Sequence, residues 1–255
     1  MTRIFLAGDS SVTSRQASMA PMVGWGQTLQ LFLQGAEVLN CARAGSSTRS
    51  FLERGRLAWI LENAVPGDIM LISFGLIDMK PGDGRYTEPF KEFQSFLREY
   101  VHAARDRGVH PVLVTSHERR VFDKFANMRR PLGLYPAAMR EVAAQLTVPL
   151  IDLNEWSVAW WRHAGPDGTK AIFLYLDPGE HPNYPEGVAD NTHLRAHGAV
   201  ECSRFIAGEL QTRGLLPPSY FRNLQAQFDP EQAVEFLPDD VFDQQTKERV
   251  AEVRR

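Results

Sequence analysis

Two short polar segments of this 255-residue chain combine residue types that carry out nucleophilic chemistry. Ser10 ends the tripeptide Gly8-Asp9-Ser10, and Asp190 precedes His193 by three residues. A serine hydroxyl becomes a nucleophile when an imidazole takes its proton, and a carboxylate on the other ring nitrogen holds the imidazole in the required tautomer. Ser10, His193 and Asp190 are therefore candidates for a triad that performs acyl transfer.

Each of these signals also has a purely structural interpretation. Asp9 and Ser10 are residue types that cap a turn, and an isolated Asp-x-x-His sequence is more often a hydrogen-bonded loop than a catalytic pair. Gly45 lies in a stretch of small residues and could bring its backbone N–H close to a developing negative charge. Taken alone, however, Gly45 is better explained as a loop glycine with a positive φ.

The order of apolar segments predicts the scaffold that brings the polar segments together. Short aliphatic runs at 3–6, 37–42, 68–73, 110–115 and 149–152 alternate with amphipathic segments at 26–34, 50–62, 88–107 and 134–146. Such alternation predicts an α/β fold, a three-layer α/β/α sandwich around a five-stranded parallel sheet. Ligands of such sheets bind at the carboxyl ends of the strands, where Ser10 and Gly45 are expected.

The C-terminal half contains segments of a different character. Helices are expected at 155–163 and 196–213, and the segment 178–190, rich in Gly, Pro and Asp, is too long for a simple connection. We expect one α/β domain over residues 1–224 and an appendage over residues 225–255, which carries eight acidic and four basic residues.

The apolar side chains of this appendage need cover from the body or from a second subunit. They are Phe236, Leu237, Val241, Phe242, Val250 and Val253. The sequence thus admits a homo-oligomer formed through this segment. The alternative is a frayed terminus.

Composition excludes several classes of partner. A net charge of −3 and a pI near 6.2 favour neither nucleic acid nor an anionic membrane surface. No apolar run approaches the roughly 18 residues of a spanning helix, and no secretory leader is recognisable, so a cytoplasmic or already trimmed protein is expected.

Cys41 and Cys202 are far apart and are expected to be free thiols. The histidines show no metal-ligand spacing, and no nucleotide-binding glycine motif follows the first strand, so no metal or cofactor is expected.

Taken together, the motifs resemble those of the SGNH, or GDSL-type, serine hydrolases, and within them the rhamnogalacturonan acetylesterase-like branch. The resemblance spans roughly residues 2 to 215. It rests on Gly8-Asp9-Ser10, Gly24-Trp25-Gly26, Phe74 to Asp78, Thr115 to Phe122, Pro149 to Leu153 and the loop Gly179 to Pro185 that leads to Asp190 and His193. The loop Gly179 to Pro185 is the piece most specific to this branch.

The resemblance implies roles for individual residues. Ser10 is expected to be the nucleophile, His193 the general base and then acid, and Asp190 the orienting carboxylate. Two oxyanion donors map to the N–H groups of Ser10 and Gly45. The third donor of the family, the asparagine of Gly-x-Asn-Asp, is replaced here by Ile77.

Loss of one oxyanion donor costs about 100- to 1,000-fold in turnover. Lys80 and His117 are candidates for a substitute donor. A second departure from the family pattern lies at Ser116-His117-Glu118, where relatives commonly carry a proline and a small apolar residue. Both departures fall where the substrate is expected, so an altered substrate is one interpretation.

The implied activity is a serine esterase that removes O-acetyl groups from a pectin- or rhamnogalacturonan-type oligosaccharide. The alternative is a degraded family member that binds a glycan or a partner without turnover, because Ile77 replaces the asparagine. Candidates for substrate contacts are Asp78, His117, His181 and Tyr184. His181 could equally hold its own loop, and the tryptophans at 156, 160 and 161 are read as packing residues rather than a sugar platform.

Overall fold

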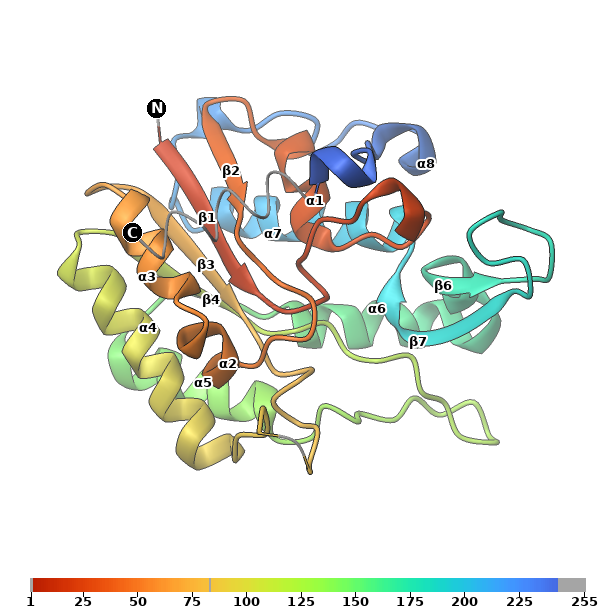
Figure 1. Cartoon of the computed structure of the whole chain (residues 1–255), viewed down its shortest axis with the longest axis horizontal. Coiled ribbons are helices and arrows are strands. Elements are labelled where there is room, and N and C mark those ends of the chain that lie inside the picture. Colours follow the sequence, from red (N-terminus) through yellow and green to blue (C-terminus); the bar gives the residue numbers. More distant parts are fainter. Residues whose placement is uncertain (1, 83, 243–255) are drawn as a thin grey trace.

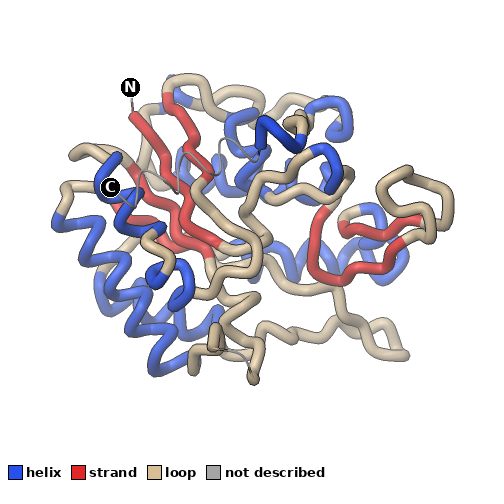
Figure 2. The backbone as a smooth tube through the Cα atoms, in the orientation of Figure 1, coloured by secondary structure: helices blue, strands red, loops and turns tan. Residues whose placement is uncertain are grey.

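A computed structural model describes residues 2–82 and 84–242 and contains the expected central sheet (Figures 1 and 2). Its strands are β1 (Thr2–Gly8), β2 (Ala36–Asn40), β3 (Ile69–Ser73), β4 (His110–Val114) and β5 (Leu150–Ile151). They pair in parallel in the order β2-β1-β3-β4-β5. All five predicted strands are confirmed, with ends that differ by a few residues.

Alternate side chains of each strand enter two separate cores, which makes the sandwich three-layered. On β1, Ile4 and Leu6 face one core while Phe5 and Ala7 face the other, and all four are fully buried. The first core is closed by α1 (Trp25–Thr28), α6 (Leu153–Gly168) and α7 (Ala196–Thr212). The second is closed by α2 (Thr48–Glu53), α3 (Arg56–Asn63), α4 (Gln94–Asp106) and α5 (Tyr135–Leu146). Figure 1 shows these two helical layers on opposite faces of the sheet.

Two of the predicted helices are interrupted. The segment expected at 50–62 is split into α2 and α3 because Gly55 adopts a left-handed φ of 69° between them. The segment expected at 26–34 is a short α1 followed by a 3-10 turn over Leu29–Phe32. Both interruptions lie beyond what helical periodicity can indicate, since the apolar spacing continues through the break.

A two-stranded antiparallel hairpin lies beside the main sheet and was not predicted. It consists of β6 (Phe173–Leu176) and β7 (Val188–Leu194), and the loop between them contains most of the segment 178–190. Figure 2 shows this hairpin separated from the five-stranded sheet. Asp190 and His193 therefore lie on a strand of this hairpin, whereas the sequence analysis ends its long loop at residue 190.

The described part of the appendage packs against the body. It contains α8 (Pro230–Ala233), and Phe228, Val234 and Phe236 contact the first core. Backbone pairing joins Leu237 to the loop after β1, with the N–H of Ala17 donating to the Leu237 carbonyl at 2.9 Å. Val241 remains 38% exposed. Val250 and Val253 lie outside the described residues.

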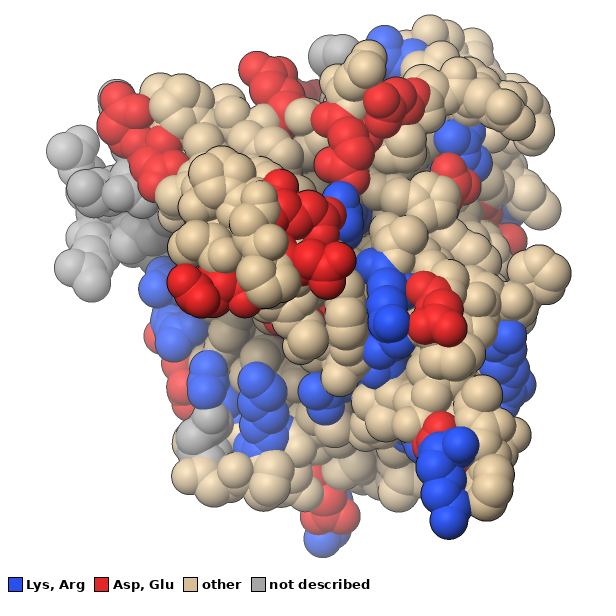
Figure 3. All heavy atoms as spheres, turned by 90° about the vertical axis from the view of Figure 1, so that its right-hand side faces the viewer, with Lys and Arg blue, Asp and Glu red and all other residues tan. Residues whose placement is uncertain are grey.

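The surface around the hairpin carries acidic and basic side chains close to one another (Figure 3). Among the described helices, none combines the length and the apolar character needed to cross a membrane. Cys41 and Cys202 are both buried free thiols, as predicted.

Candidate active site

Ser10 lies on a tight turn directly after β1. The N–H groups of Val12 and Thr13 both donate to the carbonyl of Asp9 at 3.2 Å, so the chain reverses direction there. A side chain on Gly8 would collide with Val12 and with the β3 backbone, because an added Cβ would lie 2.5 Å from Val12 Cγ2. The glycine of the Gly-Asp-Ser motif therefore lets the turn sit tightly against the sheet.

Asp9 is buried and serves the turn rather than the chemistry. Its Oδ1 accepts hydrogen bonds from the N–H of Ser11 at 2.9 Å and from Ser11 Oγ at 2.8 Å. Burial raises the pKa of the Asp9 carboxyl above its ordinary value. Asp9 thus acts as the turn-capping residue that its sequence position suggests, while the hydroxyl of Ser10 is left without a partner among the described residues.

Asp190 and His193 form a hydrogen-bonded pair on β7. His193 Nδ1 lies 2.7 Å from Asp190 Oδ2, and Asp190 Oδ1 accepts from the backbone N–H groups of Thr192 and His193 at 2.7 and 3.0 Å. Partial burial would raise the pKa of Asp190, but the bonds from His193 and Thr192 outweigh it and lower this pKa to about 2. The carboxylate therefore stays ionised and holds the proton of the neutral imidazole on Nδ1, which leaves Nε2 free to accept a proton.

A cavity of about 520 Å³ brings the predicted catalytic residues together. Ser10, Gly45, Ile77, Asp190 and His193 all line it, although they come from three strand ends and the hairpin. Neither Ser10 Oγ nor His193 Nε2 has a hydrogen-bond partner among the described residues. Both atoms are therefore available to a substrate, as a nucleophile and a base must be.

The residues expected at the oxyanion site line the same cavity. Gly45 adopts a φ of 75°, and its N–H, like that of Ser10, has no hydrogen-bond partner among the described residues. Ile77 lines the cavity with 5% of its surface exposed, so an apolar side chain stands where the resemblance implies an amide. Lys80 lines the same cavity and is the candidate third donor that lies within it.

His117 does not reach the cavity. The predictions that it contacts the substrate and that it replaces the third oxyanion donor are therefore wrong. It is fully buried against the rings of Trp161 and Phe173. Its Nδ1 lies 3.1 Å from the Glu118 carbonyl, so Nδ1 carries the proton and Nε2 can only accept. Burial lowers the pKa of His117 to about 4, and the ring is therefore neutral at pH 7.

Asp78 is likewise structural, which corrects its prediction as a substrate contact. The side chain is fully buried and accepts hydrogen bonds from the N–H and hydroxyl of Thr48 and from the hydroxyl of Thr87. Burial raises the pKa of Asp78 to about 6 despite these bonds. The residue ties the end of β3 to the start of α2.

His181 and Tyr184 hold their own loop and do not line the cavity. His181 Nδ1 accepts from the N–H of Asn183 at 3.1 Å, and the Tyr184 hydroxyl donates to the Met19 carbonyl at 3.3 Å. Asn183 Nδ2 also donates to the carbonyls of Ala17 and Ala20. Hydrogen bonds from this loop therefore hold the segment that contains Met19, and Met19 lines the cavity.

Several basic residues of the cavity were missed by the sequence analysis. Arg15, Arg85 and Arg119 line it together with Lys80. Arg85 Nη1 donates to the carbonyl of Gly45 at 3.0 Å, and Arg119 Nε donates to Thr192 Oγ1 at 2.9 Å. Arg85 and Arg119 come from segments far from Ser10 in the sequence, so no local sequence pattern marks them.

Residues 6–187 match the model of the GDSL-like lipase/acylhydrolase family. The chain belongs to this family. The match includes Ser10, Gly45 and Ile77 and ends just before Asp190 and His193 on β7. The GDSL-like sequence blocks therefore coincide with the strand ends that line the cavity.

Curated relatives of this GDSL-like chain include two proteins of Bacillus subtilis. A rhamnogalacturonan acetylesterase is 45% identical over 214 residues, which cover 84% of this chain and 91% of the relative. A protein named as a probable rhamnogalacturonan acetylesterase is 34% identical over 83% of this chain and 94% of its own length.

Solved structures share the fold. A crystal structure of a Bacillus subtilis protein superposes with a TM-score of 0.69 at 27% identity and covers 84% of this chain and 57% of that one. An acetyl-xylooligosaccharide esterase of Geobacillus superposes with a TM-score of 0.59 at 16% identity, over 82% of this chain and 94% of that one. These superpositions agree with the predicted α/β/α sandwich.

Within residues 2–82 and 84–242, no group of three or more His, Cys, Asp or Glu side chains is arranged to hold a metal ion. The chemistry described above needs only the serine, the imidazole, the carboxylate and nearby N–H groups.

Proposed function

We propose that this chain is a serine esterase that removes O-acetyl groups from a carbohydrate of the rhamnogalacturonan type. The observation that carries the proposal is the shared cavity of Ser10 and His193, with Asp190 2.7 Å from the Nδ1 side of the imidazole. The choice of an acetylated sugar follows the 45%-identical rhamnogalacturonan acetylesterase.

The geometry supports a two-step acyl transfer. His193 Nε2 takes the proton of Ser10 Oγ, and Oγ attacks the acetyl carbonyl to form a tetrahedral oxyanion. The N–H groups of Ser10 and Gly45 stabilise this anion, and His193 returns the proton to the sugar oxygen as the C–O bond breaks. Water, deprotonated by His193, then attacks the acetyl-serine, the bond from the acyl carbon to Ser10 Oγ breaks, and His193 returns the proton to Oγ as acetate leaves.

The alternative, a family member that binds a glycan without turnover, rests on Ile77. Replacement of an amide by an apolar side chain removes one donor of the oxyanion site and leaves the nucleophile, the base and its carboxylate in place. A binding module has no physical need for a serine hydroxyl and an imidazole with open hydrogen-bonding positions in one cavity. The hydrolytic function is therefore favoured.

The test is hydrolysis of p-nitrophenyl acetate and of acetylated rhamnogalacturonan oligosaccharides by the wild type and by Ser10→Ala. The wild type should release acetate, and mass spectrometry after an acid quench should detect an acetyl group on the peptide that contains Ser10. Ser10→Ala should retain its fold and lose activity. Equal rates in the two proteins would refute the mechanism, and a wild type inactive on every ester would favour the binding alternative.

A further inference from the structure

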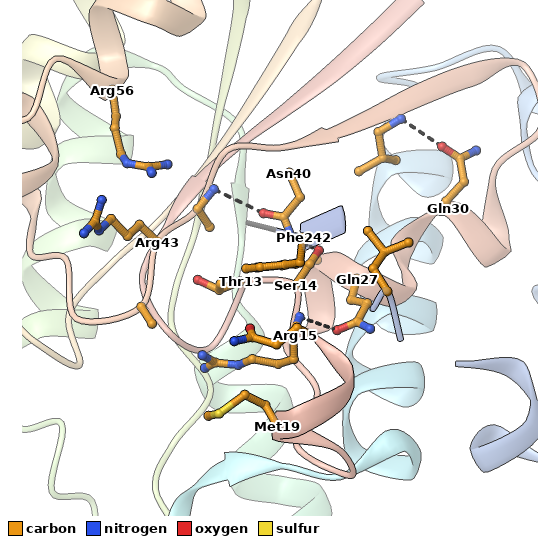
Figure 4. Close-up of a pocket in the computed structure, with 16 residues that line it drawn as sticks. Thr13, Ser14, Arg15, Met19, Gln27, Gln30, Asn40, Arg43, Arg56 and Phe242 are labelled. Atoms are coloured by element: carbon orange, nitrogen blue, oxygen red, sulfur yellow. Dashed lines mark hydrogen bonds between the residues drawn. The ribbon is translucent and has the colours of Figure 1, made fainter. Parts of the chain in front are cut away.

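A second cavity of about 570 Å³ adjoins the catalytic cavity (Figure 4). The two cavities share Arg15, Met19 and Ala44 as lining residues, so they are neighbours that one extended ligand can reach. The second cavity lies beside the ends of β1 and β2, and the C-terminal segment closes it with Leu237 and Phe242. None of the catalytic steps above uses this space.

The charge of the second cavity is one-sided. Arg15, Arg43 and Arg56 line it, and no Asp or Glu is found among its described lining residues. The side chain of Arg43 is exposed and has no ion pair or hydrogen bond among the described residues. An arginine without a carboxylate partner, beside two others, attracts an anion.

Further basic residues add to this charge. Partial burial together with the positive charges of Arg43 and Arg85 lowers the pKa of Arg54, so several cations crowd this edge of the sheet. Arg85 lines the catalytic cavity, which carries Lys80 and Arg119 as well. The carboxylate in that cavity is Asp190, which is hydrogen-bonded to His193 and lies among these basic residues. Basic side chains therefore line both cavities, from Arg43 and Arg56 to Lys80 and Arg119.

The remaining walls suit a sugar ring better than a small inorganic ion. Figure 4 shows Arg43 and Arg56 on one side of the cavity, Gln27 and Gln30 on the other, and Phe242 between them. An aromatic ring packs against the apolar C–H face of a pyranose, while the guanidinium group of an arginine binds a carboxylate through two parallel hydrogen bonds. The volume also exceeds what a single inorganic anion would fill.

We propose that this cavity is a subsite for a uronic acid residue, whose carboxylate binds Arg43 and Arg56 while the acetyl ester of a neighbouring sugar in the same chain lies at Ser10. The inference deepens the proposed function and rests on it. It assigns Arg43 as a residue that determines preference for acidic over neutral acetylated saccharides, and it gives the C-terminal segment a part in substrate binding.

Binding is measured first, with a ligand that cannot react. An unacetylated trimer of galacturonate should bind the wild type in isothermal titration calorimetry, and added salt should weaken the binding. Arg43→Gln should raise Kd by about tenfold, the usual worth of one charged hydrogen bond. Arg107→Gln is the matched control, because Arg107 is exposed beyond the end of α4 and its loss removes the same charge. This control should bind like the wild type.

Several results of the calorimetric binding measurements would overturn the proposed subsite. Failure of the trimer to bind the wild type, or equal Kd values for Arg43→Gln and Arg107→Gln, would overturn the subsite. A neutral xylose trimer that binds as tightly would remove the role of the carboxylate. Inorganic phosphate that binds as tightly as the galacturonate trimer would show a simple anion pocket and would overturn the assignment to a sugar.

Activity separates this inference from the proposed function. The ratio of kcat/KM for an acetylated uronate oligosaccharide to that for an acetylated xylo-oligosaccharide should fall about tenfold in Arg43→Gln and stay unchanged in Arg107→Gln. An unchanged ratio in Arg43→Gln would overturn the inference while leaving the esterase proposal intact. A wild type that hydrolyses no ester but binds the galacturonate trimer through Arg43 would overturn the esterase proposal and, with it, the placement of an ester at Ser10.

Discussion

Arg15 Nη2 donates a 2.7 Å hydrogen bond to the backbone carbonyl of Ser10, five residues earlier in the chain. Only 6% of Arg15 is exposed, and the residue lines both the catalytic cavity and the arginine-rich cavity beside it. Burial lowers the pKa of Arg15, and the nearby carboxylates of Asp9 and Asp190 act in the opposite direction. A buried cation thus anchors the turn that presents the nucleophile.

We expect Arg15→Met to lower kcat for p-nitrophenyl acetate by about tenfold or more. The variant loses a hydrogen bond from a charged group, which contributes roughly 1.5 to 3 kcal/mol, and the Ser10 backbone loses its anchor. Steady-state kinetics checks this, with circular dichroism to show that the fold survives. Arg222→Met is the control, since Arg222 is exposed and lines neither the catalytic nor the arginine-rich cavity. Full activity in Arg15→Met would mean that the turn holds Ser10 without it.

Ile77→Asn should raise turnover, because an amide at this position restores the third oxyanion donor. One such donor is worth about 100- to 1,000-fold in enzymes built around it, so a gain of about tenfold is a conservative expectation. Burial of the new amide costs about 1 to 3 kcal/mol where it lacks partners, so the free energy of unfolding should fall. Acetyl ester kinetics and urea unfolding measure the two effects.

Ile77→Leu is the matched control and should turn over like the wild type. If Ile77→Asn is no faster, the prediction of a missing donor is wrong. Lys80→Met then identifies the substitute, since Lys80 lies in the same cavity and its loss would slow the wild-type enzyme.

Removal of residues 225–255 should destabilise the body. The deletion uncovers the first core where Phe228, Val234 and Phe236 pack, and it breaks the bonds from Ala17 N–H to the Leu237 carbonyl and from Gln27 Nε2 to the Glu235 carbonyl. The melting temperature should drop by several degrees and binding of a hydrophobic dye should increase. A chain that ends at Phe242 keeps these contacts and serves as the control.

Size-exclusion chromatography of the wild type and of the chain that lacks residues 225–255 reports on association. If the apolar side chains are covered by the body alone, the wild type runs as a monomer and the shortened chain aggregates. Equal stability and solubility of the two proteins would favour the frayed-terminus interpretation of this segment.

His117 predicts a pH dependence of stability. Its pKa is lowered to about 4 in the folded protein, against about 6.5 for a free imidazole. The unfolded chain therefore binds a proton first as pH falls. The resulting loss of stability begins near pH 6.5, grows as pH falls towards 4, and amounts to about 3 kcal/mol once both states are protonated.

Urea unfolding of the wild type and of His117→Phe between pH 7.5 and 4 measures this term as the difference between the two proteins. His102→Gln controls for the loss of an imidazole, since His102 is exposed on α4. Parallel pH profiles for the wild type and His117→Phe would show that the buried ring does not cause the effect.

Local patterns in the sequence determine the five parallel strands and the polar motifs at their carboxyl ends. Aliphatic runs, turn residues and helical spacing are properties of short segments, and a parallel sheet places the strand ends at one edge whatever the details of the loops. These patterns, together with the resemblance to the GDSL-type hydrolases, led to Ser10, Gly45, Ile77, Asp190 and His193, which the fold gathers in one cavity.

Only the tertiary structure decided which other polar residues serve the site. β7 has no strict alternation of apolar and polar residues, because most of its side chains are of intermediate burial and neither face is fully buried, and residues up to 190 were read as part of a long loop. His117 follows a strand end as a catalytic residue would, yet aromatic neighbours from α6 and β6 enclose it. Arg15, Arg43 and Arg56 meet because two strand ends and a helix converge, a juxtaposition that no spacing along the chain encodes.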